Sequence, residues 1–335
     1  MTDLTIKKPL APIYLLYGTE SFIIKHLKEK IIHAALSHDE RAFNLGVYDM
    51  NEEPLDLALE DADTLPFMGE KKVIIIENPL FLTSDPKKQN VEHNMDKLAA
   101  YLKQPSPTAV CIFIGEFEKL DKRKKIVKQL EEAADVRECV ALTEEKLYRW
   151  LQEEAEKQQA YYTKEAHELL MAMVGDDLAI LTNEMQKLAL YVGEGGTIDR
   201  HVVEQLASRT LESNVFTMVN RIMDRKLEDA YQMLEDLLKQ KEDPIKLTAL
   251  VTRQIRLAFQ AEVYRREGYS PSQVASRLKL HPYAVKMAWK QGERLGRERL
   301  KRALIFCADM DDALKTGKID KVVGIQMLFE RMASL

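Results

Sequence analysis

The sequence predicts an α/β domain with a parallel sheet, followed by two all-helical domains. Short apolar runs alternate with amphipathic stretches over residues 1–142, whereas from residue 143 onward every segment has the pattern of a helix. The two most apolar runs, at 73–77 and 109–115, show no alternation of apolar and polar residues, as expected for strands covered on both faces. Strand and helix patterns that alternate in this way indicate a parallel sheet between helices.

The first domain, residues 1–142, is expected to contain five strands. They are predicted at 13–17, 45–49, 73–77, 109–115 and 136–140. Helical stretches between them include 20–36, 55–62 and 122–133.

The second and third domains are predicted at 143–211 and 212–335. Thr143 precedes Glu144 and Glu145, which is the pattern of a helix start with acids near the positive end of the dipole. Four short helices are expected up to residue 210, with breaks near 162–163, 175 and 193–197. Longer helices follow at 214–224, 226–241, 244–267, 271–278, 282–293, 297–315 and 319–333. The run from Ser270 to Gln273 combines an N-cap, a proline at the first helical position and a capping-box glutamine.

Composition predicts a cytoplasmic globular protein. Of the 335 residues, 46% are hydrophobic and 31% are charged, and no apolar run approaches the roughly 20 residues that span a bilayer. The N-terminal sequence does not read as a signal peptide. The three cysteines lie far apart without metal-ligand spacing, so buried reduced thiols are expected.

Charge is distributed unevenly along the chain. The net charge is −5, yet residues 253–302 carry 13 Lys and Arg against 4 Asp and Glu. Such a basic segment is typical either of a nucleic-acid surface or of helices that dock on an acidic partner, and composition does not separate the two. Any contact with DNA is expected to be made to the phosphate backbone.

The residues that would hold a nucleotide are absent. A phosphate-binding loop needs glycines whose backbone N–H groups surround the phosphates, and a Lys followed by Ser or Thr. After Gly18 the chain lacks the second glycine and that Lys-Ser/Thr pair, and the Glu20 carboxylate would repel phosphates. Glu116, after the run at 109–115, lacks the aspartate partner that a Mg²⁺ site needs. ATP hydrolysis is therefore not expected.

Other catalytic and metal-binding patterns are also absent. None of the seven histidines forms a ligand pair at helical spacing, and no GxSxG motif occurs. Asp309, Asp311 and Asp312 are interpreted as a solvated helix face because their spacing does not bring all three together. We therefore expect no catalytic residue, no cofactor and no metal ion.

An α/β domain followed by a small helical domain is the plan of a AAA+ ATPase module, and a third helical domain is typical of clamp-loader subunits. Several segments, taken together and in order, resemble the delta subunit family of the bacterial DNA polymerase III clamp loader. They are 12–31, 64–79, 118–130, 176–193 with 198–199, 243–260, 278–288 and 311–317. The resemblance covers nearly the whole chain.

The resemblance implies a role in DNA replication. Members of the family bind the beta sliding clamp through the first domain and hold its ring open. They assemble through the third domain with the motor subunits (tau/gamma) and delta prime, and meet primed DNA through that complex. ATP is bound by the motor subunits, which agrees with the missing phosphate loop. No membrane partner is implied.

The resemblance also implies a clamp-contacting segment at Leu65, Phe67 and Met68. The family places two adjacent large apolar residues there; this chain has Phe-Met, whereas Leu-Phe is the commoner pair. Pro66 is expected to stiffen the approach and Gly69 to permit a sharp turn. The competing interpretation is that these side chains cover the core of their own domain.

A basic cluster at Lys122, Arg123, Lys124 and Lys125 has two interpretations. It is either a solvated helix face beside neighbouring subunits or a contact to the phosphate backbone of DNA, and the sequence does not decide between them.

Two other functions compete with the clamp-loader role. An active AAA+ ATPase is disfavoured by the missing nucleotide motifs. A DNA-binding regulator is suggested by residues 270–291, which resemble a helix-turn-helix with Val274 and Ala275 in its first helix and Pro282 opening its second. The first turn of that second helix is mostly apolar, which favours packing against other helices over the reading of bases.

Overall fold

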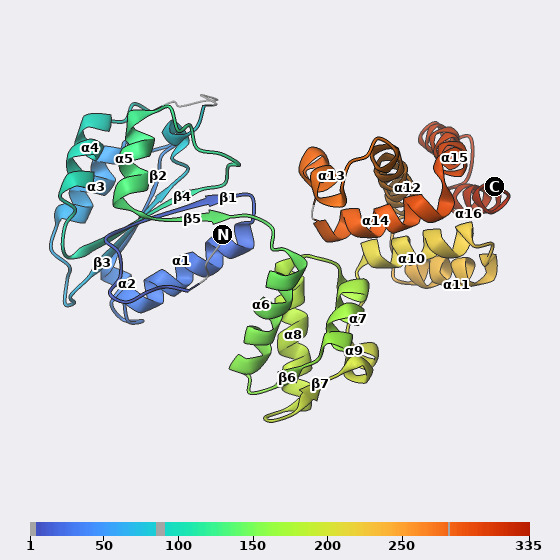
Figure 1. Cartoon of the computed structure of the whole chain (residues 1–335), viewed down its shortest axis with the longest axis horizontal. Helices are drawn as coiled ribbons and strands as arrows, with labels where there is room; N and C mark the ends of the chain where they lie inside the picture. Colours follow the sequence, from blue (N-terminus) through green and yellow to red (C-terminus); the bar gives the residue numbers. More distant parts are fainter. Residues whose placement is uncertain (1–4, 85–90, 281) are drawn as a thin grey trace. The chain divides into compact units, whose positions relative to one another are not determined.

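The computed structural model describes residues 5–84, 91–280 and 282–335. The chain forms two compact units, Met1–Ala141 and Leu142–Leu335. Figure 1 shows the α/β unit in blue to green and the helical unit in green to red. The predicted fold class, a parallel α/β domain followed by helices, is confirmed.

A five-stranded parallel sheet forms the centre of the first unit, with the strand order β2-β3-β4-β1-β5. Its strands are β1 (Ile13–Gly18), β2 (Leu45–Asp49), β3 (Lys72–Glu77), β4 (Ala109–Gly115) and β5 (Asp135–Cys139). All seven residues of β4 are buried, which is why this run shows no polar alternation. The five predicted strands are therefore confirmed to within one residue at each end.

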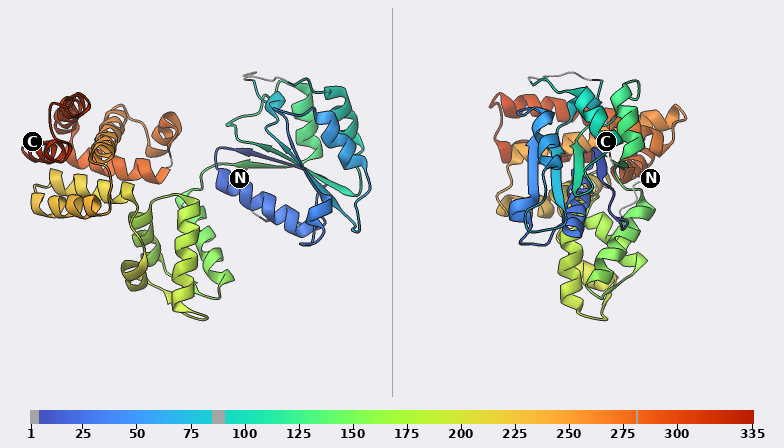
Figure 2. Two further views of the ribbon diagram at one scale, coloured as in Figure 1. Left: turned by 180° about the vertical axis from the view of Figure 1, so that it is seen from behind. Right: turned by 90° about the vertical axis from the view of Figure 1, so that its left-hand side faces the viewer.

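Helices cover both faces of this sheet (Figures 1 and 2). Helix α1 (Ser21–Ala35) lies on one face and is in contact with β1, β3, β4 and β5. Helices α3 (Leu55–Asp63), α4 (Met95–Lys103) and α5 (Lys125–Ala133) lie on the other, where Ile13, Leu15 and Tyr17 of β1 pack into one apolar cluster with them. The unit also has a short helix α2 (Arg41–Asn44) and a 3₁₀ turn η1 (Leu80–Leu82).

The parallel sheet has two opposite edges, and the candidate functional segments are divided between them. We call the edge where the strands end the carboxyl edge; it carries the turns after β1 and β4. The edge where the strands begin is the amino edge, and it carries α2 before β2 and the segment 64–71 before β3. Helix α5 begins at Lys125, so Lys122, Arg123 and Lys124 lie in the preceding turn and not in the helix predicted at 122–133.

The second unit begins with α6 (Glu144–Lys157), α7 (Lys164–Val174), α8 (Leu178–Val192) and α9 (Arg200–Leu206). These helices agree with the prediction for this region, but the expectation of helix alone was wrong. Two short parallel strands, β6 (Tyr161–Tyr162) and β7 (Thr197–Ile198), pair at the predicted breaks. Thr143 occupies the N-cap position of α6, although its side chain makes no capping hydrogen bond.

Helix α12 (Pro244–Arg266) lies in contact with most of the remaining helices of the second unit. It contacts α10 (Leu211–Met223), α13 (Pro271–Leu278), α14 (Pro282–Leu295), α15 (Arg297–Lys315) and α16 (Lys321–Ala333). Helix α11 (Leu227–Lys239) packs mainly on α10 and α16. Gly292 lets α14 approach α12 closely, because a Cβ there would lie 2.6 Å from the carbonyl oxygen of Ala258. The predicted capping box of Ser270 and Gln273 is confirmed.

Among the described residues, none of the helices combines the length and apolar character needed to span a bilayer. A further division of the second unit near residue 211 stays a prediction.

Candidate functional site

Three large apolar side chains project from the segment between α3 and β3 at the amino edge. Leu65 is 81% exposed, Phe67 is 55% exposed and Met68 is 86% exposed. The segment thus does not use these side chains to fill the core of its own domain. Three exposed apolar groups this close together in sequence are a candidate interaction site. We call this group, Leu65, Phe67 and Met68, the apolar knob.

A polar network anchors the two ends of the segment that carries the knob. The Lys72 ammonium, at the start of β3, donates to Asp61 Oδ1 at 2.7 Å and to Thr64 Oγ1 at 2.5 Å. The Tyr48 hydroxyl of β2 donates to Asp61 Oδ2 at 3.0 Å. Burial alone would raise the pKa of Asp61, but the hydrogen bonds from Lys72 and Tyr48 outweigh it and hold that pKa below its usual range. The end of α3 is therefore tied to two strands.

The sharp turn in the segment occurs at Met68, one residue before the position predicted. Met68 has φ +50°, a left-handed conformation that side-chain-bearing residues other than Asn and Asp rarely adopt. Gly69 has another reason to lack a side chain, since a Cβ there would lie 2.6 Å from Glu40 Oε1. The segment thus carries an exposed methionine on a strained backbone.

Sequence reasoning missed two residues of α2 that touch the knob. The Phe43 ring lies 5.3 Å from the Phe67 ring, centroid to centroid, and it too is exposed. The buried Asn44 side chain forms hydrogen bonds to the backbone of Phe67. Neither residue belongs to a motif, and both meet Phe67 across more than twenty intervening residues, so periodicity gave no indication of the contact.

The turn after β1, at the carboxyl edge, is too short and too closely packed to surround phosphates. Thr19 and Glu20 alone connect Gly18 to α1. The backbone N–H of Glu20 donates to the carbonyl of Cys139 at 3.0 Å, and a Cβ on Gly18 would lie 1.9 Å from that same oxygen. The Glu20 N–H, in the position where a phosphate loop directs donors at its ligand, is here bonded to β5.

Phe117 covers the end of β4 at the same edge. Its ring stacks on that of Tyr17, with centroids 6.1 Å apart, and leaves no room for a side chain at Gly115. An aromatic pair therefore lies beside Glu116, the residue considered above as a lone Mg²⁺ ligand.

The four basic residues of the cluster at the carboxyl edge have different partners. The Lys124 ammonium donates to the carbonyls of Phe81 and Thr83 at 2.9 and 2.7 Å, so it stabilises η1. Lys122 pairs with Glu131, and Arg123 pairs with Asp121 through two 2.8 Å hydrogen bonds. Lys125 is exposed and makes no ion pair within the described ranges. The cluster lies at the edge opposite the apolar knob.

Some of the basic groups in the segment 253–302 are bound within their own unit. Arg265 and Arg266 both donate to the buried Glu262, and Arg294 donates to Asp224 and Asn220. The Arg299 side chain donates to the carbonyl of Met223. Several of the basic groups that suggested a nucleic-acid surface therefore stabilise helix packing.

The candidate helix-turn-helix, α13 and α14, is integrated into the helical unit. Val274, Ala275 and Val285 are buried together in a small cluster that includes Tyr264 and Trp289. Lys286, in the second turn of α14, pairs with Glu144 of α6 at 2.6 Å. The first turns of the candidate recognition helix thus face other helices of the chain. His281, between the two helices, lies outside the described residues.

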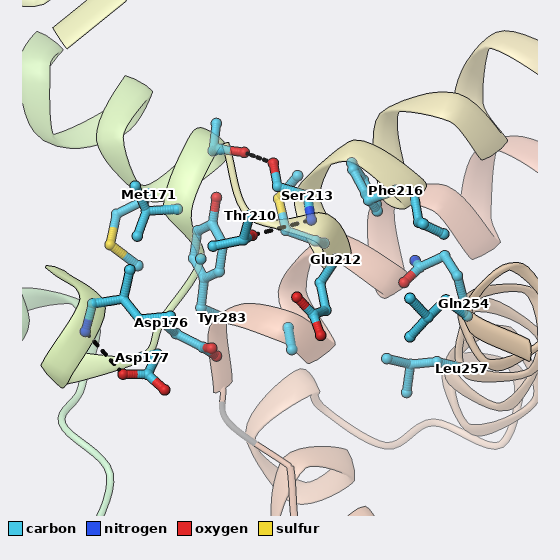
Figure 3. Close-up of a pocket in the computed structure, with 18 of the residues that line it drawn as sticks. Met171, Asp176, Asp177, Thr210, Glu212, Ser213, Phe216, Gln254, Leu257 and Tyr283 are labelled. Atoms are coloured by element: carbon cyan, nitrogen blue, oxygen red, sulfur yellow. Dashed lines mark hydrogen bonds between the residues drawn. The ribbon is translucent and has the colours of Figure 1, made fainter. Parts of the chain in front are cut away.

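A cavity of about 390 Å³ lies within the second unit, among α7, α8, α10, α12 and α14 (Figure 3). Its charged lining comprises Asp176, Asp177, Glu212 and Arg253, an excess of carboxylates that disfavours an anionic ligand. Tyr283 also lines it, and burial raises the pKa of this phenol to about 12. Within the described part of the chain, no group of three or more His, Cys, Asp or Glu side chains is placed to hold a metal ion.

Family models match most of the chain. The model for the DNA polymerase III delta subunit matches residues 14–140, and that for the C-terminal domain of the same subunit matches residues 212–332. A third, described as a middle domain, matches residues 143–205.

A curated sequence and a solved structure are similar to this chain over nearly its full length. The chain is 38% identical over 321 residues to the DNA polymerase III subunit delta of Bacillus subtilis (strain 168), covering 96% of this chain and 92% of that one. A solved structure of the Bacillus subtilis DNA clamp loader delta protein superimposes with a TM-score of 0.80 at 36% identity, covering 97% of this chain and 96% of that one.

Proposed function

Because the chain belongs to the family of DNA polymerase III delta subunits, we propose that it binds the beta sliding clamp and opens its ring for loading onto primed DNA. The observation that carries this proposal is the apolar knob of Leu65, Phe67 and Met68 at the amino edge of the sheet. Exposed anchors of this kind supply most of the free energy of association when they enter an apolar pocket.

Opening the ring needs no chemistry from this chain. A ligand shifts a conformational equilibrium by its differential affinity for the two states. A knob that fits a pocket better in the open clamp than in the closed one will therefore favour the open ring. Nucleotide would be bound by the motor subunits (tau/gamma), with which the second unit assembles together with delta prime. The short, closely packed turn after β1 supports the proposal that the motor subunits, and not this chain, bind nucleotide.

The basic cluster is assigned a secondary role in the proposal. Lys125 is exposed, and so are Lys122 and Arg123, whose surface ion pairs with Glu131 and Asp121 would be exchanged for contacts to a neighbouring subunit or to the phosphate backbone of DNA. Lys124 is excluded from that set because its ammonium is bound to two carbonyls of its own unit.

The proposal is tested by release of a beta clamp that has been closed around circular DNA. A stoichiometric amount of the isolated chain is expected to accelerate clamp release without nucleotide, and Mg-ATP is expected to leave the rate unchanged. Isothermal calorimetry with Mg-ATP is the second arm. Absence of release, release that depends on ATP, or a micromolar dissociation constant for ATP would contradict the proposal.

Met68 offers a variant in which stability and binding are expected to separate. Asn tolerates the left-handed backbone better than Met does, so Met68→Asn should leave the melting temperature unchanged or slightly higher. Clamp binding should weaken by about tenfold or more, because burial of an apolar side chain this large is worth about 1.5–3 kcal/mol. Surface plasmon resonance and a thermal melt measure the two quantities.

The matched control for this variant is Met68→Leu, which keeps an apolar side chain on the same backbone. It is expected to bind the clamp within a few-fold of the unaltered chain. Equal affinities for Met68→Asn and the unaltered chain would show that Met68 lies outside the contact.

A further inference from the structure

Helix α2 places a second aromatic ring against the apolar knob. Phe43 is 67% exposed, and its ring is tilted by 49° to that of Phe67 at a centroid distance of 5.3 Å. Tilted and offset aromatic pairs of this separation attract one another. The two rings therefore form one continuous apolar surface made from segments that are separated in sequence by α3 and β2.

Asn44, the residue after Phe43, forms two hydrogen bonds with the backbone of Phe67. Its Oδ1 accepts a hydrogen bond from the Phe67 N–H at 2.6 Å, and its Nδ2 donates to the Phe67 carbonyl at 2.8 Å. The Asn44 side chain is fully buried. The Asn44 side chain thereby satisfies both the N–H and the carbonyl of Phe67. These two bonds fix the position of the Phe67 backbone at the surface.

Two polar residues that precede α2, Ser37 and Glu40, also bear on the position of the segment that carries the knob. Glu40 accepts hydrogen bonds from the N–H and hydroxyl of Ser37 at 2.7 and 2.6 Å, and its carboxylate lies against Gly69. The segment that carries the knob is therefore bonded to α2 at Phe67, and at Gly69 it packs closely on Glu40, the residue before α2.

We propose that α2 is part of the clamp-contacting surface, with Phe43 as a further contact residue and Asn44 as the positioning residue that presents Phe67. This inference rests on the proposed function. The occupant is the beta clamp because Phe43 is continuous with the knob: a pocket that receives Phe67 must also meet the ring packed on it. Anchors that cluster at the centre of an interface are typical of strong binding sites.

The contact role of Phe43 is tested by Phe43→Ala in the full-length chain, with affinity for the beta clamp measured by surface plasmon resonance. Binding is expected to weaken by about tenfold. Tyr161→Ala is the matched control, because Tyr161 is an aromatic residue exposed to the same 67% but belongs to β6 in the other unit. It is expected to leave affinity unchanged. Equal affinities for Phe43→Ala and Tyr161→Ala would overturn the contact role.

The positioning role of Asn44 is tested by Asn44→Ala alone and in a Phe67→Ala background. The single change should weaken clamp binding by about tenfold, and it should have little further effect once the Phe67 ring is gone. Hydrogen exchange at the Phe67 amide should accelerate in the single variant. A loss of affinity that is equally large in both backgrounds would assign Asn44 a general structural role and overturn this part of the inference.

Phe67→Ala, measured in parallel, separates failure of this inference from failure of the proposed function. If Phe67→Ala leaves the affinity for the clamp unchanged, both the proposed clamp site and the inference about α2 are wrong. If Phe67→Ala weakens binding while Phe43→Ala and Asn44→Ala do not, the clamp site stands and α2 is not part of it. Should Asn44→Ala fold poorly, Phe43→Ala still decides the contact role, because the Phe43 side chain is exposed.

Discussion

Replacing both Phe67 and Met68 by alanine is expected to weaken binding to the beta clamp by about a hundredfold or more. Anchors of this kind each cost about 2 kcal/mol or more when truncated, and about 1.4 kcal/mol corresponds to a factor of ten. The two side chains are exposed in the free chain, so their removal takes little from the core. The unfolding temperature should therefore stay within a few degrees of its original value.

Surface plasmon resonance against the clamp measures this effect, with circular dichroism as the control for folding. A double change to Leu at both positions keeps the apolar character and should retain much of the affinity. A folded double-alanine variant with unchanged affinity would place the clamp site elsewhere on the chain.

The second large effect is expected from separating the two units. A fragment of residues 1–141 should bind the clamp within about threefold of the full chain, yet fail to co-elute with the motor subunits. The reason is that the sheet with its apolar cluster and the knob belong entirely to this unit. The complementary fragment, 142–335, should assemble with the motor subunits and lose clamp binding completely.

The position of the cut matters for this experiment. A cut at 211 would break a contact inside the second unit, because Ser213 Oγ on one side of the cut donates to the carbonyl of Ala172 on the other at 2.6 Å. A cut at 141 leaves this contact intact. Size-exclusion chromatography of each fragment with the clamp and with the motor subunits measures which partner it binds. Clamp binding by the fragment 142–335 alone would contradict the placement of the clamp site in the first unit.

Elements whose residues are decided by burial were predictable from the sequence. The runs at 73–77 and 109–115 lie in the middle of the sheet, and their uninterrupted apolar character follows from that position. The capping box at Ser270 was predictable because it depends on residues three apart. Local patterns of this kind are visible without knowledge of the fold.

Features decided by contacts distant in sequence were not predictable. Lys124 is the N-cap residue of α5, and its ammonium is bound by two carbonyls some forty residues earlier, whereas lysine by itself favours a helix interior. Strands β6 and β7 have two residues each, too few for a period to appear. The apolar knob was located by resemblance, but its attachment to Asn44 depends on a pairing of segments that sequence does not display.

The opposite placement of the knob and the closed β1–α1 turn has a consequence for redesign. A nucleotide-binding loop grafted after β1 would have to release the Glu20 N–H from Cys139 and lift Phe117 away from Gly115. Those atoms all lie at the carboxyl edge, whereas Phe67 is held by Asn44 at the amino edge. A nucleotide-binding loop could therefore be designed at the carboxyl edge without altering the residues that we propose contact the clamp.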